Sequence, residues 1–452
     1  MIEHSVILEY QRCRGCTTCI KNCPTEAIRV RNGKATILSE RCIDCGKCIQ
    51  VCPHKAIKSV GDTLDRIGEF KYCVALPDPS LYGQFQHLDD INIVLTALLE
   101  IGFDHVFETA RAGDILADYM RQCIAAGSLK VKPQISSACP AILRLIRLRF
   151  PKLIPNVAQI PSPLELAAVM ARQEAVEETG LKPEDIGIFA IVPCSCEVTA
   201  AQAAGASQQS IDVCLAARDV YLKLLEPMKN CKEVKQLSSA GVMGMGWAFV
   251  GGESASRLNE SYVAVDGIEN CIRMLEEIED GRLPEADFIE LNACVQGCVG
   301  GCFNVENPYG ARMRIKKLMR GMPASRNHYD ETQLSRDVLQ GRELQYIPAL
   351  LLDEDRFAAM EKLMKINKLE RTLPGLDCGS CGAPSCHALA EDVILGRASE
   401  EDCIFKVRER TRDMAGGGDA DEYLPAPFRH QLKRAPDDSP QSDVEHKGGT
   451  DQ

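Results

Sequence analysis

The sequence predicts a central α/β domain flanked by two small cysteine-rich modules. Its length of 452 residues corresponds to about three domains at roughly 150 residues each. Apolar strand-like runs alternate with amphipathic helical stretches through the middle of the chain, which is typical of α/β proteins. The 23 cysteines are not spread evenly but gather in short groups near both ends. Together these observations predict one large domain with a compact metal-binding module on each side.

Composition and charge exclude several classes of function. The formal net charge of −12, from 52 basic and 64 acidic residues, argues against a general nucleic-acid binder. No run of 18 apolar residues is present, so we expect no membrane span. The first ten residues, MIEHSVILEY, lack a basic segment followed by a long apolar one, so we expect no secretory signal and a cytoplasmic protein. In a reducing compartment, regularly spaced cysteines indicate metal sites more often than disulfides.

Residues 1–60 contain an internal repeat. The motif CxxCxxCxxxCP occurs twice, and the second copy follows the first after 29 residues. We expect a short strand at SVILEY, a cysteine loop with a turn of helix, a strand at KATILS and a second cysteine loop. The two motifs comprise Cys13, Cys16, Cys19 and Cys23 before Pro24, and Cys42, Cys45, Cys48 and Cys52 before Pro53.

This duplicated motif has the ligand spacing of two [4Fe–4S] clusters. In two-cluster arrangements the fourth cysteine of each run ligates the other cluster. The motif resembles that of the bacterial two-cluster ferredoxins, and the resemblance implies a role in electron transfer. A pair of zinc sites is the alternative, because zinc also uses paired CxxC motifs. The predicted sets are Cys13, Cys16, Cys19 and Cys52 for one cluster, and Cys42, Cys45, Cys48 and Cys23 for the other.

The α/β expectation for residues 70–350 rests on specific segments. YCVALP, HVFET, IGIFAIV, SYVAVDG and DFIELNA read as strands, and INIVLTALLEIG and LELAAVMARQEAVEET read as helices. Four cysteines, at 139, 194, 294 and 298, lie in this region in the contexts SSACPAILRL, AIVPCSCEVTAAQ and DFIELNACVQGCVGG. Cys139 and Cys194 adjoin prolines at positions that look like strand ends, where α/β proteins commonly place sites. Spacing alone leaves a set of free core thiols as the alternative.

The order of these contexts after a two-cluster module resembles the catalytic domain of the [FeFe] hydrogenases. The resemblance covers roughly residues 70–320 and includes VALPDPSLYGQF, the PSP segment at 161–163, SSAGVMGMGWAFVGG and AVDGIENC. It implies an H-cluster, in which a cubane is joined by one thiolate to a diiron unit. It also implies that Cys139, Cys194 and Cys294 ligate the cubane, and that Cys298 bridges to the diiron unit.

The departures from the family pattern bear on function. The family's proton-donor cysteine is replaced by Ala138, which has no proton to give. Glu197 stands where the family has a lysine, and it would repel an anionic ligand unless burial keeps it protonated. Two methionine positions hold Val192 and Asn292. In the family's proton path Ser162 matches the serine, whereas Asp114 and Arg111 stand in the region of the two carboxylates.

Three outcomes stay open for the central site. The cofactor is complete but slow, or complete and used to sense hydrogen, or it lacks the diiron unit. Loss of a positioned acid costs roughly 10²–10⁴ in rate, so we expect low turnover or a sensory role. Cys196 and Cys302 are candidates for a substitute proton relay or for alternative ligands, although both are also ordinary small buried residues. We expect the other thiols not to be ligands: Cys73, Cys123, Cys214, Cys231 and Cys271.

The C-terminal region predicts a third cysteine module over residues 352–410. A charged amphipathic helix near 352–370 leads into LPGLDCGSCGAPSCHALAEDVILGRASEEDC, where ALAEDVILG reads as a short helix. This segment resembles the four-cysteine [4Fe–4S] domain of corrinoid iron–sulfur proteins and membrane electron-transport subunits; zinc is the alternative. We expect His387 to face solvent. Residues 414–452, rich in Gly, Asp, Pro, Ser and Lys, read as a disordered tail. The candidate ligands are Cys378, Cys381, Cys386 and Cys403.

The sequence therefore predicts a small α+β ferredoxin domain (1–60), a hydrogenase-like α/β domain (70–350) and a small helical iron–sulfur domain (352–410). It favours slow interconversion or sensing of hydrogen, with a cubane-only electron-transfer protein as the alternative. A cluster-assembly protein is less favoured, because four complete ligand sets suggest permanent occupancy. The expected partners are an electron-transfer protein or a signalling protein, since no signalling motif is visible in the chain.

Overall fold

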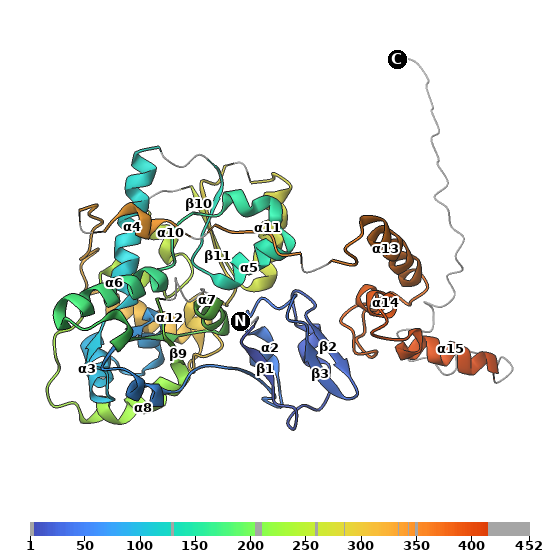
Figure 1. Cartoon of the computed structure of the whole chain (residues 1–452), viewed down its shortest axis with the longest axis horizontal. Coiled ribbons are helices and arrows are strands. Elements are labelled where there is room, and N and C mark those ends of the chain that lie inside the picture. The colour runs from blue at the N-terminus through green and yellow to red at the C-terminus, as the bar shows by residue number, and fades with distance from the viewer. Residues whose placement is uncertain are drawn as a thin grey trace, which may run out of the picture.

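The computed structural model describes residues 4–127, 131–203, 210–257, 261–283, 285–332, 334–341, 343–348 and 351–414. A large α/β body lies on one side, the N-terminal module is in the middle, and the C-terminal helices lie beyond it (Figure 1). The predicted tail falls almost wholly outside the described residues. Because the N-terminal module lies in the middle, it contacts both other parts of the chain.

The N-terminal module consists of two antiparallel strand pairs around two cysteine loops. Strand β1 (Val6–Leu8) pairs with β4 (Ile57–Ser59), and β2 (Ile28–Arg31) pairs with β3 (Lys34–Ile37). Each loop ends in a short helix: α1 (Thr18–Lys21) and α2 (Lys47–Val51). The sequence predicts β1 and β3 but not β2 and β4, which have only four and three residues and carry charged side chains.

The central domain contains two parallel sheets. The first has the order β6-β5-β8-β9, and the second has the order β10-β11-β7. Every residue of β8 is buried, as expected for an inner strand covered on both faces. All five predicted strands are present, whereas β7 and β9 were too short to predict. The bounds are β5 (Tyr72–Pro77), β6 (His105–Val106), β7 (Gln134–Ile135), β8 (Ile186–Val192), β9 (Val213–Ala216), β10 (Tyr262–Asp266) and β11 (Phe288–Asn292).

Helices connect and cover these strands. Both predicted helices are present, and the second begins at a capping box in which Ser162 and Glu165 bond each other's backbone amides. The helices are α3 (Ile91–Glu100), α4 (Thr109–Ala125), α5 (Pro140–Arg149), α6 (Pro163–Thr179), α7 (Ser195–Ala203), α8 (Ala217–Asn230), α9 (Val242–Gly246), α10 (Gly252–Ser256), α11 (Ile268–Glu279) and α12 (Pro308–Met319). None of the described helices is both long and apolar enough to cross a membrane.

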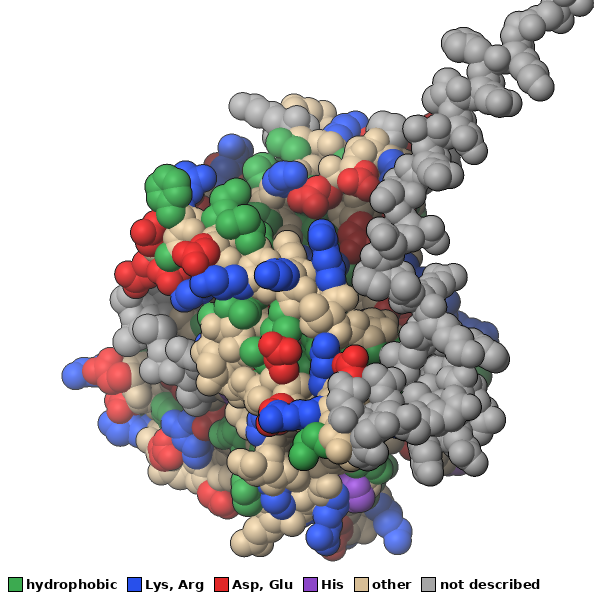
Figure 2. Space-filling model, turned by 90° about the vertical axis from the view of Figure 1, so that its right-hand side faces the viewer, with side chains coloured by type: hydrophobic (Ala, Val, Ile, Leu, Met, Phe, Trp, Pro, Cys, Tyr) green, Lys and Arg blue, Asp and Glu red, His purple; other side chains and the backbone are tan. Residues whose placement is uncertain are grey.

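The C-terminal module is helical. Helix α13 (Arg356–Glu370) is capped by the Asp355 side chain and packs against α14 (Cys386–Ile394), and α15 (Ile404–Met414) follows. Both predicted helices are thus present in this region. His387 is about half exposed and pairs with Glu370, in agreement with the expectation that it faces solvent. On the face of the molecule that carries this module, charged side chains of both signs are interspersed with small apolar patches (Figure 2).

Candidate metal centres

The first cavity of the N-terminal module is lined by four cysteines from both loops. Cys13, Cys16 and Cys19 come from the first loop, and Cys52 comes from the end of α2 in the second. Apolar residues such as Val30, together with polar ones such as His54, line the rest of the cavity. These four thiols are the set that the sequence predicts for one cluster, in which the fourth cysteine comes from the other motif.

The second cavity has the reciprocal composition. Cys42, Cys45 and Cys48 come from the second loop, and Cys23 comes from the first. Eight cysteines therefore meet in two sets of four, each set drawing its fourth member from the other loop. Their ligation of iron remains a prediction.

Burial makes several of these thiols, Cys19, Cys42, Cys45 and Cys48, poor thiolates without a bound cation. It raises the pKa of Cys19 to about 11, with the neighbouring Cys16 thiol adding to the effect. It raises the pKa of Cys42 to about 12, and that of Cys48 well above the ordinary range. Four thiolates in such a cavity need positive charge nearby, and metal ions supply it.

The spacing of the thiols argues against single zinc ions. Four sulfurs around one zinc, each roughly 2.3 Å from it, lie about 3.8 Å from one another. Within the described part of the chain, the one group of three or more possible ligands whose atoms all lie within 4.8 Å of one another is His4, Cys42 and Asp44. The Asp44 carboxylate is already engaged by Ser5 and Arg144. Among the described residues, neither four-cysteine set meets that spacing, which favours a larger cluster over one ion.

The central cysteines meet at the carboxyl ends of strands from both sheets. Cys139 follows β7 and begins α5, Cys194 follows β8, and Cys294 follows β11. Cys298 begins the 3-10 turn Cys298–Gly300. All four line one cavity, which is where open α/β sheets place their ligands.

Two glycines beside these cysteines leave no space for a side chain. A Cβ on Gly297 would lie 2.6 Å from the Val250 nitrogen, and φ is +84° there. A Cβ on Gly301 would lie 2.3 Å from the Pro193 carbonyl oxygen. The ACVQGCVGG segment therefore needs its glycines for close backbone packing around the cavity.

The two extra thiols occupy different places. Cys196 lines the central cavity, and its sulfur lies 3.2 Å from that of Cys194. A hydrogen bond from the Cys196 thiol lowers the pKa of Cys139 to about 6. Cys302 instead lies beside Ser195 and Gly46, where the second cysteine loop meets the central domain. Of the two, Cys196 is the one placed among the candidate ligands.

Glu197 lies between the central cavity and a neighbouring one. It lines both, and the neighbouring cavity is also lined by Ser137, Ser162 and Glu165. Burial, together with the charges of Cys194, Asp78 and Cys139, raises the pKa of Glu197 well above its usual range. Its buried Oε2 has no hydrogen-bond partner among the described residues. A neutral acid at this place could donate a proton rather than repel an anion.

Asp114 and Arg111 have structural partners. The Asp114 carboxylate accepts hydrogen bonds from the amides of Gly241 (2.8 Å) and Gly244 (2.7 Å), and also from Arg326 and Asn327. Arg111 pairs with Glu174 at 2.8 Å. Neither residue lines the two cavities described above. The structure therefore does not support placing either of them in a proton path.

Sequence reasoning missed three large side chains of the central cavity: Trp247, Glu253 and Glu290. Glu253 pairs with buried Arg257 and accepts a hydrogen bond from the Ser136 hydroxyl. The same hydroxyl oxygen accepts a hydrogen bond from the Ala138 backbone amide at 3.1 Å. Burial, with the nearby Glu253 charge, raises the pKa of Glu290 to about 7. For Glu290, the sequence did offer a signal, namely a carboxylate inside the strand-like run FIELN.

The second cysteine loop is docked directly on the central cavity. Cys45 lines both its own cavity and the central one. The Ser195 hydroxyl donates to the Asp44 carbonyl oxygen at 2.7 Å, and the Gln50 amide donates to the Gly300 carbonyl oxygen at 2.9 Å. The two cysteine sets are therefore neighbours.

This contact gives a stability prediction at Gly46. A Cβ there would lie 2.5 Å from the Cys302 sulfur, whereas a Cβ on Gly33, at the same φ of +72°, would meet nothing within 4 Å. We expect Gly46→Ala to lose about 1–3 kcal/mol more than Gly33→Ala, because overpacking adds to the same backbone strain. Thermal unfolding of both anaerobic variants measures the difference. Equal losses would show that the contact tolerates a methyl group.

The C-terminal cysteines lie in one loop-and-helix unit. Cys378 is exposed, Cys381 and Cys386 are partly buried, and Cys403 is buried. Burial raises the pKa of Cys381, and the neighbouring Cys378 and Cys403 add to the effect. Cys386 begins α14 and packs in the same apolar cluster as Cys403. The four thiols thus surround one small region, as the sequence predicts.

Fold and cysteine sites together define an iron–sulfur protein with a hydrogenase-like central domain. The family model for the iron only hydrogenase large subunit, C-terminal domain, matches residues 71–245 and 228–302, just over half of the chain. A 4Fe-4S dicluster domain matches residues 5–53, and a putative Fe-S cluster domain matches residues 373–405. The chain belongs to the iron-only hydrogenase large-subunit family, of which it is a divergent member.

Curated relatives match shorter stretches. An uncharacterized protein of Methanocaldococcus jannaschii is 36% identical over 52 residues, 12% of this chain and 23% of that protein. The cytosolic Fe-S cluster assembly factor nar1 of Aspergillus flavus is 26% identical over 110 residues, 24% of this chain and 18% of that protein. The NADP-reducing hydrogenase subunit HndD of Solidesulfovibrio fructosivorans is 24% identical over 106 residues, 22% of this chain and 18% of that protein. The matched stretches thus span about a fifth of these relatives.

Among solved structures, an [FeFe]-hydrogenase HydA1 from Chlamydomonas reinhardtii is similar over 64% of this chain and 97% of that one. The TM-score is 0.48 and the identity is 14%.

Proposed function

We propose that this protein is an iron–sulfur redox protein with four cubane clusters, one of them part of an H-cluster, and that it interconverts or senses hydrogen slowly. The observation that supports this proposal best is the central cavity. Cysteines from four separate segments line it, with Ala138 beside them at the place of the family's proton donor. The ligand sets are those predicted from the sequence for the N-terminal, central and C-terminal regions.

In the central cavity, Cys139, Cys194 and Cys294 would hold the cubane, and Cys298 would bridge to a diiron unit, which supplies the hydrogen chemistry when bound. The chain's own residues then decide how protons arrive. Ala138 offers none. The acids lining the cavity are Glu197, kept neutral by burial, Glu253, held by Arg257, and Glu290, whose pKa burial raises to about 7.

Slow chemistry suits sensing as well as catalysis. A positioned acid contributes roughly 10²–10⁴ in rate, so its loss leaves a cofactor that responds to hydrogen without high flux. The partner would be a ferredoxin-like electron carrier if the protein is an enzyme, and a signalling protein if it is a sensor. Hydrogen turnover, measured with and without an added electron carrier, separates these two cases.

The experiment that tests the proposal is infrared spectroscopy of protein matured with a diiron complex. We expect bands of CO and cyanide bound to iron, and hydrogen turnover well below that of ordinary family members. Absence of the bands, with iron present at the cubane ligands, would contradict hydrogen chemistry. Turnover near the family's usual level would contradict the argument from Ala138.

The variant Ala138→Cys tests whether the missing donor limits the rate. We expect it to raise turnover by up to about 10²-fold, because it restores an acid at the donor place. Ala293→Cys is the matched control, since Ala293 lines the same cavity after β11. An unchanged rate in Ala138→Cys would move the limitation to Glu197 or Asn292.

A second candidate is a cubane-only electron-transfer or assembly protein without a diiron unit. The similarity to nar1, a cytosolic Fe-S cluster assembly factor, favours it. So does the loss of the polar residues that the family places around the diiron unit. The same infrared measurement separates the candidates, because a cubane alone carries neither CO nor cyanide.

A further inference from the structure

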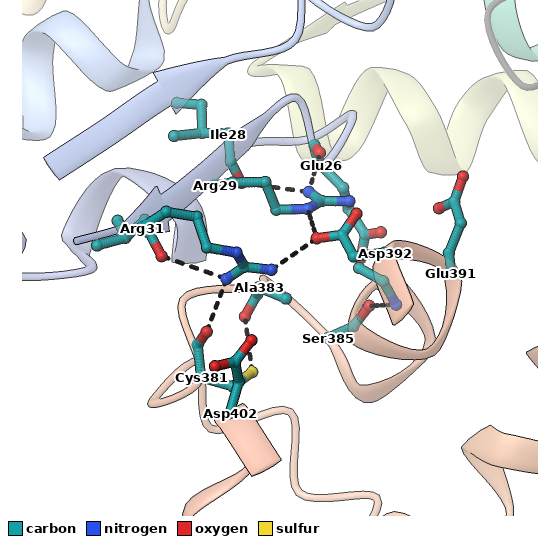
Figure 3. A network of polar contacts seen from close by, with 12 residues as sticks. Glu26, Ile28, Arg29, Arg31, Cys381, Ala383, Ser385, Glu391, Asp392 and Asp402 are labelled. Atoms are coloured by element: carbon teal, nitrogen blue, oxygen red, sulfur yellow. Dashed lines mark hydrogen bonds and ion pairs between the residues drawn. The ribbon is translucent and has the colours of Figure 1, made fainter. Parts of the chain in front are cut away.

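The C-terminal module packs against the β2–β3 hairpin of the N-terminal module through buried ion pairs (Figure 3). Asp392 of α14 pairs with Arg29 at 2.6 Å and with Arg31 at 2.8 Å, and the side chains of Arg29 and Asp392 are 5% and 3% exposed. Glu391 pairs with Arg41, and both side chains are buried. Separating the modules would leave these charges without partners, so the ion pairs fix one relative position.

Backbone contacts bring the C-terminal cysteine loop against the same hairpin. The Val30 amide donates to the Gly382 carbonyl oxygen at 2.7 Å, and Arg31 donates to the Cys381 carbonyl oxygen at 2.7 Å. A Cβ on Gly382 would lie only 1.9 Å from the Val30 carbonyl oxygen. The cysteine loop therefore reaches the hairpin only because glycine stands at position 382.

Val30 also connects this contact to the first cysteine cavity. Its side chain lines the cavity of Cys13, Cys16, Cys19 and Cys52, but not that of Cys23, Cys42, Cys45 and Cys48. On the other side of the loop, a Cβ on Gly379 would lie 3.4 Å from Ile20, the residue after Cys19. Val30 thus contacts both the loop that follows Cys381 and the cavity that holds Cys13.

We propose that this interface joins the Cys378, Cys381, Cys386 and Cys403 set to the Cys13, Cys16, Cys19 and Cys52 set, so that the C-terminal module is an electron port. The inference rests on the proposed function, since both sets must hold [4Fe–4S] clusters. One electron passes per step: the cluster that gives it is oxidised from [4Fe–4S]⁺ to [4Fe–4S]²⁺, and the cluster that receives it is reduced by the same amount. A low-potential one-electron carrier outside the chain supplies or removes the electron.

The order of the cysteine sets follows from the shared residues. Val30 lies between the C-terminal loop and the Cys13 cavity, and Cys45 lines both the second cavity and the central one. The electron path therefore begins at the C-terminal set and passes through the first and second sets to the central cavity. Asp392 and Glu391 are positioning residues in this path and touch no cluster.

The test is electron paramagnetic resonance of the dithionite-reduced full chain, with iron and zinc content measured on the same samples. In the unaltered protein we expect the C-terminal cluster signal to be broadened by the spin of the neighbouring cluster. Gly382→Ala should abolish the broadening and leave the iron content unchanged. Gly375→Ala is the matched control, because Gly375 also has positive φ in this module and a Cβ there meets nothing within 4 Å.

A second pair of variants guards against local damage to the cysteine loop. The double variant Glu391→Gln with Asp392→Asn removes the ion pairs without touching the loop, and we expect the same loss of broadening. Glu370→Gln, which removes only the exposed pair with His387, should leave the spectrum unchanged.

The outcomes separate the two proposals. Full iron with no broadening in the unaltered protein, or broadening that survives both interface variants, overturns the electron port and leaves the cluster assignment standing. Zinc in place of iron at the C-terminal set overturns the cluster assignment together with the port. Broadening that is lost in both interface variants and kept in both controls supports the port.

Discussion

Replacement of Cys52 by alanine is expected to remove the cluster of the first cysteine loop, although Cys52 belongs to the second. The reason is geometric: Cys52 lines the cavity of Cys13, Cys16 and Cys19, and is absent from the cavity of Cys42, Cys45 and Cys48. A cubane deprived of one of its four thiolates loses a ligand that no other thiol lining that cavity supplies. The effect is the loss of a whole cluster, which is the largest change that we predict for a single thiol.

The measurement compares spectra of matched variants. Cys52→Ala should give the same iron loss and the same magnetic resonance spectrum as Cys16→Ala, and Cys23→Ala should match Cys45→Ala. Cys73→Ala, a buried thiol in the sheet of the central domain, should keep all the iron. If Cys52→Ala instead matched Cys45→Ala, each loop would hold its own four ligands. The prediction that each loop gives its fourth cysteine to the other cluster would then be wrong.

Asp114→Ala is expected to destabilise the central domain by about 4 kcal/mol or more, since four donors lose their acceptor. The buried carboxylate accepts hydrogen bonds from the Gly241 and Gly244 amides, from the Arg326 amide and from the Asn327 side chain. Removing it leaves buried donors without acceptors, each at a cost of about 1–3 kcal/mol. These bonds hold the glycine-rich segment before Trp247 against α4. The contact is close, since a Cβ on Gly244 would lie 1.7 Å from the Ala110 carbonyl oxygen.

Calorimetry of the anaerobic protein measures this loss, and Asp219→Ala, an exposed carboxylate on α8, is the control. Asp114→Asn distinguishes a structural role of Asp114 from a role in proton transfer. The asparagine side chain keeps the shape of aspartate, but its NH2 group would face N–H groups that also need an acceptor. We expect it to be destabilising too. A variant Asp114→Asn that kept full stability but lost hydrogen turnover would restore the interpretation of Asp114 as a proton relay.

Much of the fold could be predicted because its signals are local. The duplicated CxxCxxCxxxCP motif predicts the N-terminal module, and apolar runs such as IGIFAIV predict the inner strands. Several short strands escaped prediction, among them β7 with two residues and β9 with four, although β3, as long as β9, was predicted. Such short strands carry little periodicity. They are strands because neighbouring strands pair with them, which a single sequence does not display.

The central site was predicted only through a family resemblance, since its cysteines are spread from 139 to 298. The proton-path expectation shows the limit of that resemblance. Asp114 has the right chemistry, but the structure directs its carboxylate to four structural donors. Glu253, which no motif indicated, lines the cavity and reaches Ala138 through Ser136.

The sequence by itself determined the number and spacing of the cysteine groups, the inner strands and the absence of a thiol at position 138. These follow from covalent order and local periodicity. Only the tertiary structure decided that the central thiols share a cavity, because parallel strands from two sheets bring their carboxyl ends together regardless of their separation along the chain. It also decided that the C-terminal module rests on the β2–β3 hairpin. Arg29 and Arg31, two residues apart on one strand, project to the same face and meet Asp392 some 360 positions later in the chain.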